Sequence, residues 1–223
     1  IVINAPIVKS ANNSAGLTLT ADNDITVNQS VSLSTNNLAT STTSGANAQF
    51  IATAGGAFAI NNATVEAFHI SVSAASISRS GAQANDFVFG FVFPTNGTLT
   101  LTTQSGAVGS LANPIRFANP DFAGRTWGVN TVNAGAAGNI FIQPTKNDYG
   151  TFGGAAIQTD PATTQTVYLN HTGTGTFALY DDITGNDNWT LNSGGNFSAN
   201  NFGGGGNGGK LTANSITSTI AGN

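Results

Sequence analysis

The chain has 223 residues and a formal net charge of −4, and only 7% of its residues are charged, against roughly 25% in an ordinary globular protein. Its six basic residues are scattered and its pI is near 4.7, which excludes the basic surface of a nucleic-acid-binding protein. The sequence has no Cys, so disulfides and thiolate metal sites are excluded. It also has no apolar run long enough to span a bilayer. Few charges and many Thr and Asn residues favour an extracellular location.

Short alternating segments that end in Gly- and Asn-rich turns dominate the chain. Leu17–Ala21 leads through Asp22–Asp24 into Ile25–Asn28, and the same pattern returns at Thr98–Thr102 and at Lys210–Thr217. Strict alternation gives a strand one apolar face and one polar face. Recurrence of such units predicts strands that stack on copies of themselves. We therefore predict an all-β chain built as a solenoid.

The expected strands follow the chain without a clear domain boundary, so residues 1–223 are interpreted as one all-β unit. Because the sequence has neither an initial Met nor a signal peptide, we interpret it as a processed form or segment of a longer chain. The expected strands are Ile1–Asn4, Leu17–Ala21, Ile25–Leu33, Phe50–Thr53, Ala57–Ile60, Thr64–Ile77, Phe87–Phe93, Thr98–Thr102, Val129–Val132, Ile140–Ile142, Thr166–Asn170, Thr176–Tyr180, Trp189–Asn192, Asn196–Ala199 and Lys210–Thr217.

Two segments interrupt this regular pattern. Phe87–Phe93 carries four Phe residues on one face, and a Pro94–Gly97 turn joins it to Thr98–Thr102. This arrangement predicts a hairpin over 87–102, inserted within residues 80–103 and outside the stack. Gly203–Gly209 is a glycine run that predicts a flexible loop.

Four segments of the sequence resemble a known family. They are Ile3–Ser34, Gly106–Phe117, Ala136–Gln143 and Gly208–Ser218, about a third of the chain. Together they resemble the filamentous-haemagglutinin-like β-helix segments of large secreted bacterial adhesins, of the two-partner secretion and autotransporter types. The resemblance implies a right-handed parallel β-helix and a rod-like protein at the bacterial cell surface. It carries no catalytic residues to this chain.

The leading functional hypothesis is therefore a structural and adhesive surface protein that binds a glycan or protein of a host or neighbouring cell. One alternative is a self-assembling filament or sheath subunit, for which a β-sandwich or jelly-roll-like fold is also compatible. Its end strands would pair with a second copy. The residues expected at those ends are Ile1, Val2, Ile3, Leu211, Ile216 and Ile220. A third alternative is a carbohydrate-binding or polysaccharide-active β-helix.

Catalytic chemistry is not indicated by the sequence. The two histidines, His69 and His171, have no evident nucleophile or orienting partner, and no nucleophile-elbow motif is present. Polysaccharide-cleaving β-helices use clustered Asp with Arg or Lys, but Asp121 near Arg125 and Lys146 near Asp148 are only neighbours in sequence. We predict that the chain is not an enzyme and needs no cofactor.

Binding sites are predicted from two residue classes. Carboxylates are ligands for Ca²⁺, and the weak candidates are Asp181, Asp182 and Asp187, with Asp22 and Asp24 more typical of turns. Aromatic rings can stack on sugars, and the candidates are Trp127, Trp189, Tyr168 and Tyr180. The Thr-x-Thr pairs at 18–20 and 98–102 are similar to those of ice-binding solenoids, but as read from the sequence they are too few and too irregular.

Overall fold

The computed structural model describes residues 1–9, 16–33, 48–89, 91–92, 95–118, 126–131, 138–145, 150–152, 157–159, 163–172, 177–179, 183–184, 186–198 and 211–220. All regular secondary structure in these residues is β-strand, which confirms the all-β prediction. Across the same residues, no helix of a length and apolarity sufficient to cross a bilayer is found.

Three parallel sheets hold most of the strands. The four-stranded sheet contains β1 (Val2–Ile3), β4 (Ile25–Val27), β7 (Ala57–Asn61) and β10 (Ser76–Ser80). The nine-stranded sheet contains β2 (Ile7–Val8), β5 (Val31–Ser32), β8 (Val65–Ala67), β11 (Phe87–Phe89), β15 (Ile115–Ala118), β17 (Ile140–Pro144), β20 (Thr166–His171), β23 (Asn188–Ser193) and β26 (Ser215–Ile220). The six-stranded sheet contains β3 (Gly16–Ala21), β6 (Gln49–Ala54), β9 (His69–Ala74), β14 (Thr98–Thr103), β16 (Thr126–Thr131) and β19 (Ile157–Gln158).

Smaller sheets complete the described strands. A three-stranded parallel sheet contains β18 (Gly150–Phe152), β21 (Phe177–Leu179) and β24 (Phe197–Ser198). A two-stranded parallel sheet contains β22 (Ile183–Thr184) and β25 (Leu211–Thr212). One antiparallel pair joins β12 (Phe91–Val92) to β13 (Thr95–Asn96).

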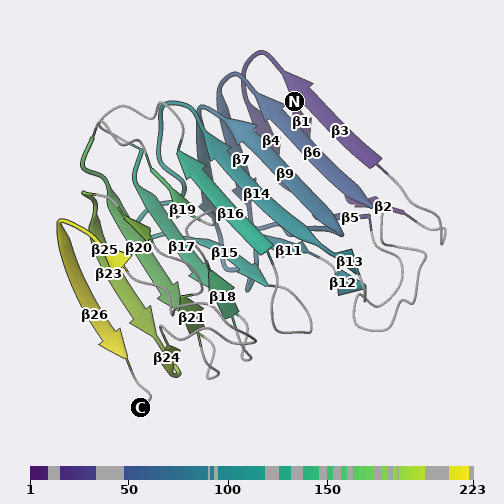
Figure 1. The fold of residues 1–223 in the computed structure, drawn as a ribbon. Coiled ribbons are helices and arrows are strands. Elements are labelled where there is room, and N and C mark those ends of the chain that lie inside the picture. Colours follow the sequence, from purple (N-terminus) through teal and green to yellow (C-terminus); the bar gives the residue numbers. More distant parts are fainter. Residues whose placement is uncertain are drawn as a thin grey trace.

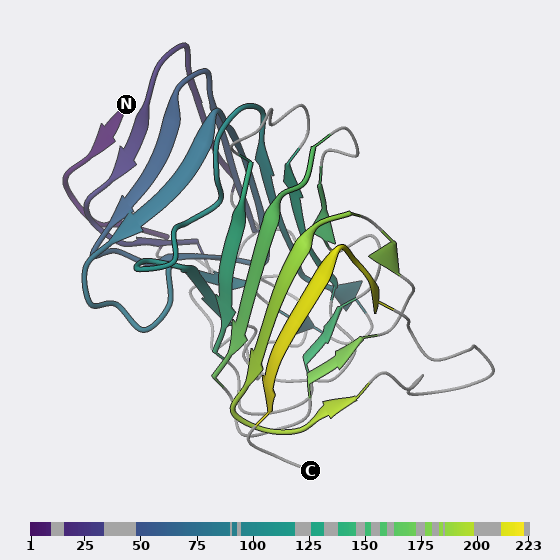
Figure 2. The ribbon, with the colours of Figure 1, turned by 90° about the vertical axis from the view of Figure 1, so that its left-hand side faces the viewer.

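The chain visits the sheets in rotation. From β1 to β14 it passes from the four-stranded to the nine-stranded to the six-stranded sheet and back, and we call one such passage a circuit. Within each of the three sheets, equivalent strands of neighbouring circuits therefore pair in parallel. Figure 1 shows the strands side by side in chain order, with the N-terminus at one end of the stack and the C-terminus at the other. The same progression of colours is visible in the view turned by 90° (Figure 2).

Equivalent residues of successive circuits lie on top of one another and form an aligned stack, which we call the first column. Its paired members are Ile25, Phe58, Ile77, Val108, Ile140, Val167, Trp189 and Ile216. Ile1, which directly precedes the Val2–Thr26 pair, extends the register by one position. All members from Ile25 to Trp189 are at most 2% exposed, whereas Ile1 is 47% and Ile216 is 49% exposed. The column is therefore a continuous apolar stack, of which Ile1 and Ile216 are the exposed members.

Whereas the first column begins in the four-stranded sheet, a second column lies in the nine-stranded sheet. Its first part is apolar and consists of Ile7, Val31, Val65, Phe87 and Phe117, followed by Pro144. Later in the chain His171 pairs with Ser193, which pairs with Ile220. His171 and Ser193 are buried, so the interior becomes polar towards the C-terminus.

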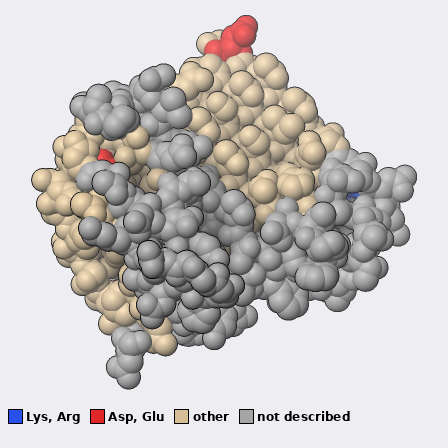
Figure 3. Space-filling view, in the orientation of Figure 1, with Lys and Arg blue, Asp and Glu red and all other residues tan. Residues whose placement is uncertain are grey.

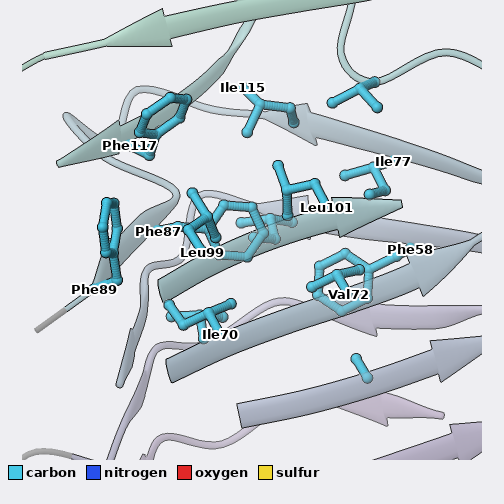
Figure 4. Packing of buried hydrophobic residues seen from close by; sticks show 14 of the residues in the cluster. Phe58, Ile70, Val72, Ile77, Phe87, Phe89, Leu99, Leu101, Ile115 and Phe117 are labelled. Carbon is cyan, nitrogen blue, oxygen red and sulfur yellow. The ribbon is translucent and has the colours of Figure 1, made fainter. Parts of the chain in front are cut away.

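Period-2 alternation places the apolar side chains inside and the hydroxyl side chains outside. In β14 the buried Leu99 and Leu101 alternate with half-exposed Thr98, Thr100 and Thr102. In Figure 3 a broad, continuous tan area, made of uncharged residues, faces the viewer, with one red group at its upper edge. On the inner side, Ile70 and Leu99 of the six-stranded sheet face Phe58 and Phe87 from the other sheets (Figure 4). The rings of Phe58 and Phe87 are stacked with centroids 6.3 Å apart.

The expected hairpin over 87–102 is corrected by the strand pairing. Phe87–Phe89 pairs in parallel with β8 and β15, and Thr98–Thr103 pairs in parallel with β9 and β16. Among the described residues of this segment, antiparallel pairing is confined to β12 and β13. Phe87 and Phe89 are buried, so burial inside the stack, rather than a separate hairpin, covers this apolar strand.

The expected single strands Ile25–Leu33 and Thr64–Ile77 are also divided, into β4 and β5 and into β8, β9 and β10. At the break between β8 and β9, the consecutive residues Ala67 and Phe68 are both buried. Two inward residues in succession cannot occur in a regular strand, and they mark the corner where the chain passes between sheets. The glycine run Gly203–Gly209 lies outside the described residues.

Candidate functional site

The outer side of β3, β6, β9 and β14 forms a surface that we call the hydroxyl face. Its residues are Thr18, Thr20, Thr53, Ser71, Ser73, Thr98, Thr100 and Thr102, all exposed or half-exposed. None of the four strands contains a charged residue. The broad tan area in Figure 3 has no red or blue residues within it.

The hydroxyl side chains are aligned from strand to strand. Thr20 pairs with Thr53, Thr53 with Ser73, and Ser73 with Thr102. In the neighbouring row, Thr18 and Ser71 are separated by Ile51, which is the one apolar member. Within a row, side chains on neighbouring strands are about 4.8 Å apart, and adjacent rows are about 6.8 Å apart along the strands. The two short Thr-x-Thr runs seen in the sequence thus belong to one array of four aligned strands, which spacing in sequence could not reveal.

His69 lies at the edge of the hydroxyl face. Its Nδ1 is 2.9 Å from Thr98 Oγ1, and its ring meets Phe68 edge-on at 4.7 Å. Burial lowers the pKa of His69 below its ordinary value of 6.5. The imidazole is therefore neutral at pH 7, and the face stays uncharged.

A second group of polar residues forms the corner between β10 and β11, and we call it the corner cluster: Arg79, Gln83, Asn85, Asp86 and Arg116. Arg79 Nε donates to Asp86 Oδ1 at 2.8 Å, and both side chains are 1% exposed. Burial raises the pKa of Asp86, while hydrogen bonds from the Arg116 backbone and from Arg79, with the charges of both arginines, oppose the rise. Nothing in the sequence pointed to this cluster except the position of Arg79, two residues after the apolar Ile77 in an alternating strand.

The calcium candidates are not brought together in the described part of the chain. Asp187 is buried, and its carboxylate accepts hydrogen bonds from Thr159 Oγ1 at 2.6 Å and from the Gln165 N–H at 3.0 Å. Asp181 and Asp182 lie outside the described residues. Asp24 Oδ1 accepts the Ala57 N–H of the next circuit at 2.7 Å, so its carboxylate links two circuits. Within the described residues no three His, Cys, Asp or Glu side chains form a group that could hold a metal ion.

The aromatic candidates are equally separate. Trp189 is buried in the first column, so its ring packs inside the protein instead of presenting a face to a sugar. Tyr168 is half-buried, with its ring 6.4 Å from that of Phe141, and its hydroxyl accepts a hydrogen bond from Asn192 Nδ2 at 3.3 Å. Trp127 belongs to β16, but its side chain and all of Tyr180 lie outside the described residues.

The two histidines lie in different sheets and form no common site. His171 Nδ1 is 3.1 Å from Ser193 Oγ, and both residues are buried, so a substrate could not reach this pair in the folded chain. The carboxylates and cations considered for polysaccharide cleavage (Asp121, Arg125, Lys146 and Asp148) lie outside the described residues. That the chain is not an enzyme remains a prediction.

The residues that the sequence predicts at self-associating ends differ in how far their side chains are exposed. Ile1, Val2 and Ile216 are exposed, by 47%, 59% and 49% respectively. Ile3 is buried, and Leu211 and Ile220 are half-buried. Three of the six side chains are therefore accessible to a neighbouring molecule.

Comparison with known proteins gives no relative of this chain. No protein-family model, no curated protein and no solved structure matches it. A function therefore follows only from the residues and their geometry.

Proposed function

We propose that this chain is a right-handed parallel β-helix that serves as a rod-like structural and adhesive part of an extracellular bacterial surface protein. The first column carries the proposal, because equivalent residues of successive circuits stack in parallel register from Ile25 to Ile216. Stacked units of this kind build rods that present long surfaces. The right-handed sense is supported by the strong preference for right-handed crossovers between parallel strands, in about 98% of cases.

The hydroxyl face is the best candidate for the adhesive surface. It is uncharged, its strands lie side by side, and each Thr or Ser hydroxyl can both donate and accept a hydrogen bond. Such a surface suits a neutral polysaccharide, whose hydroxyl groups need the same two functions. A charged partner such as an acidic glycan would find no counter-charge on these strands.

Binding to immobilised neutral and acidic polysaccharides tests the adhesive role. The wild-type chain should bind a neutral polysaccharide, and binding should change little between low and high salt, because no charge pairs are formed. Thr100→Lys should abolish binding, since Thr100 lies within the hydroxyl face. Thr190→Lys is the matched control, because Thr190 is a half-exposed residue of β23 in another sheet. No binding to any neutral polysaccharide, or equal loss in both variants, would contradict this role.

The rod itself is tested by an experimental structure. Electron cryomicroscopy of the chain fused to a larger carrier should show strands advancing by about 4.8 Å per circuit. A left-handed path of the chain, or a sandwich of two sheets, would refute the β-helix.

A second function, self-assembly into a filament, is favoured by the exposed apolar side chains of Ile1 and Ile216 in the first column. Ile1 and Ile216 are exposed, whereas the members between them are buried. Contact between the two different ends is heterologous, and such contacts produce open filaments. This contact would bury the apolar side chains of the end residues, and each Å² of apolar surface buried would stabilise the association by about 25 cal/mol.

Light scattering of Ile216→Lys against Leu111→Lys separates this function from the first. Leu111 is also exposed, by 65%, but it lies in a turn away from both ends. Self-assembly requires large particles for the wild type and the Leu111 variant, and monomers for the Ile216 variant. A wild-type chain that stays monomeric at high concentration would exclude this function and leave the adhesive one intact.

A further inference from the structure

The corner cluster places an arginine at an apolar position. Arg79 pairs in register with Ile60 of the preceding circuit, and Ile60 pairs with Val27. Ile60 and Val27 are fully buried, and Arg79 is 6% exposed. A buried guanidinium is costly unless a carboxylate and further hydrogen bonds compensate it, so its presence at this point of the stack calls for a physical role.

The guanidinium of Arg79 is well compensated. Its Nε donates to Asp86 Oδ1 at 2.8 Å, and its Nη2 donates to the carbonyl oxygens of Gly81 at 3.0 Å and Gln83 at 3.3 Å. Gly81 has a φ of +93°, and a Cβ there would lie 2.7 Å from Asn62 Cβ. The loop that connects β10 to β11 thus folds tightly around the arginine.

Asp86 joins three successive circuits. Its Oδ2 accepts the Arg116 N–H at 2.7 Å, and its backbone oxygen accepts the Val65 N–H at 2.8 Å. Val65 belongs to the third circuit (β7–β9), Asp86 to the fourth (β10–β14), and Arg116 to the fifth, which contains β15 and β16. A single side chain and its backbone therefore hold both neighbours of the fourth circuit.

Asn85 extends these contacts by one more circuit. Its backbone oxygen accepts a hydrogen bond from Thr64 Oγ1 at 2.9 Å. Its Oδ1 accepts one from Thr145 Oγ1, which follows β17 in the sixth circuit. Adjacent residues 85 and 86 thus contact four consecutive circuits through side-chain bonds, in addition to the sheet ladders.

The corner cluster also lies where the architecture changes. The four-stranded sheet ends at β10, and beyond it the first column continues through the isolated bridge of Val108 to Ile140 in the nine-stranded sheet. In a stack of repeating units, stability is a sum of local and nearest-neighbour terms, so a change of architecture is a natural place for the stack to unfold in parts. The cluster bridges that place.

We propose that the Arg79–Asp86 pair couples two regions of the stack, residues 48–80 before it and residues 163–193 after it, so that they unfold as one cooperative unit. We call the pair the clasp. The pair fixes the relative position of three circuits by directional bonds, and the adjacent Asn85 adds a bond to a fourth; apolar packing at the position of the pair could not do this. Buried ionic pairs that specify one arrangement at some cost in stability are known. This role concerns the stack itself and holds whether the protein is adhesive or forms filaments.

Replacement of the pair by apolar residues tests the clasp. Arg79→Met with Asp86→Leu removes both charges and fills a similar volume, so neither region is left with an unpaired buried charge. Hydrogen exchange followed by mass spectrometry in increasing urea reports each region separately. In the wild type, peptides from residues 48–80 and 163–193 should lose protection at the same urea concentration. In the double variant, the two midpoints should separate by roughly 1 M urea.

Phe58→Leu is the matched control, because it weakens the first region and leaves the clasp in place. It should lower both midpoints together. Coincident midpoints in the double variant would overturn the proposal and reduce the pair to a local contact. A double variant that does not fold at all would also overturn it, because removal of a coupling device should leave each region able to fold.

Discussion

The interiors of the N-terminal region, residues 48–89, and the C-terminal region, residues 163–198, are built differently. In the N-terminal region the columns consist of side chains such as Phe58 and Phe87, and the buried polar pair Arg79–Asp86 lies at its end. In the C-terminal region four polar residues are buried within a short stretch: Gln165, His171, Asp187 and Ser193. The strands of both regions pair in parallel, so this pairing is compatible with an apolar interior and with a partly polar one.

The difference shows two ways to stabilise stacked strands. Apolar columns stabilise the fold through the apolar area that they bury, and they tolerate substitutions by apolar residues of similar size. Buried polar residues gain little net free energy but become costly when a partner is lost. Substitutions in the N-terminal region should therefore act in proportion to volume, and those in the C-terminal region in proportion to hydrogen bonds lost.

The largest expected effect is that of Phe58→Ala. The ring of Phe58 is fully buried and contacts Phe50 and Phe87 at centroid distances of 6.3 Å. Loss of such a ring costs about 3–5 kcal/mol of unfolding free energy. Urea unfolding measures it, and Phe58→Leu should lose distinctly less. Equal losses in the two variants would show that volume is not what stabilises this region.

A smaller loss, about 1–3 kcal/mol for each group left unsatisfied, is expected for Asp187→Ala. This change leaves the Gln165 N–H and the Thr159 hydroxyl without their acceptor. Asp187→Asn keeps one side-chain oxygen of almost the same size and should recover part of the loss. If the Asn and Ala variants unfold alike in urea, hydrogen bonding by Asp187 does not stabilise the C-terminal region.

Acidification should weaken the N-terminal region through His69. Its folded-state pKa is lowered by burial, so the unfolded chain binds the proton more readily. The stability contributed by His69 is then present above its unfolded pKa of about 6.5 and is lost as the pH falls below it. The urea midpoint of the wild type should fall between pH 7.5 and 5.5 by more than that of His69→Gln. A fall of the same size in both would assign the pH dependence to other groups.

The smallest effect is expected at Glu66, which is half-buried and accepts a hydrogen bond from Ser32 Oγ at 3.1 Å. Burial raises its pKa above 4.5, and the bond from Ser32 opposes the rise. The stability it contributes is therefore present at low pH and is lost as the pH rises through the folded-state pKa. Glu66→Gln should raise the urea midpoint slightly at pH 7 and leave it unchanged near pH 3. A decrease at pH 7 would contradict this sign.

Alternation was sufficient to predict most strands. In β7, β14, β20 and β23 every second residue is buried, and in β3 half-buried residues alternate with exposed ones. The register between strands could not be predicted. Members of the first column are separated by as few as 19 residues, from Phe58 to Ile77, and by as many as 33, from Ile25 to Phe58. Without a constant period, nothing in the sequence indicates which residues lie side by side.

The candidate sites were harder to predict for the same reason. The hydroxyl face joins residues from Thr18 to Thr102, and the corner cluster joins Arg79 to Arg116, so both depend on register. Trp189 was interpreted as a sugar-stacking candidate, although its place between Asn188 and Thr190 is equally typical of an inward strand residue. Residue type alone does not distinguish the two faces of a strand.

The unequal spacing of the first column has a practical consequence. Successive members stay aligned whether 19 or 33 residues separate them, so the connections can differ in length without moving the stacked positions. Foreign peptides could therefore be inserted into exposed turns such as Ser110–Asn113 and displayed there at a fixed place on a stiff support. In this sense the fold is a scaffold in which the stacked residues set the geometry and the connections are free to be redesigned.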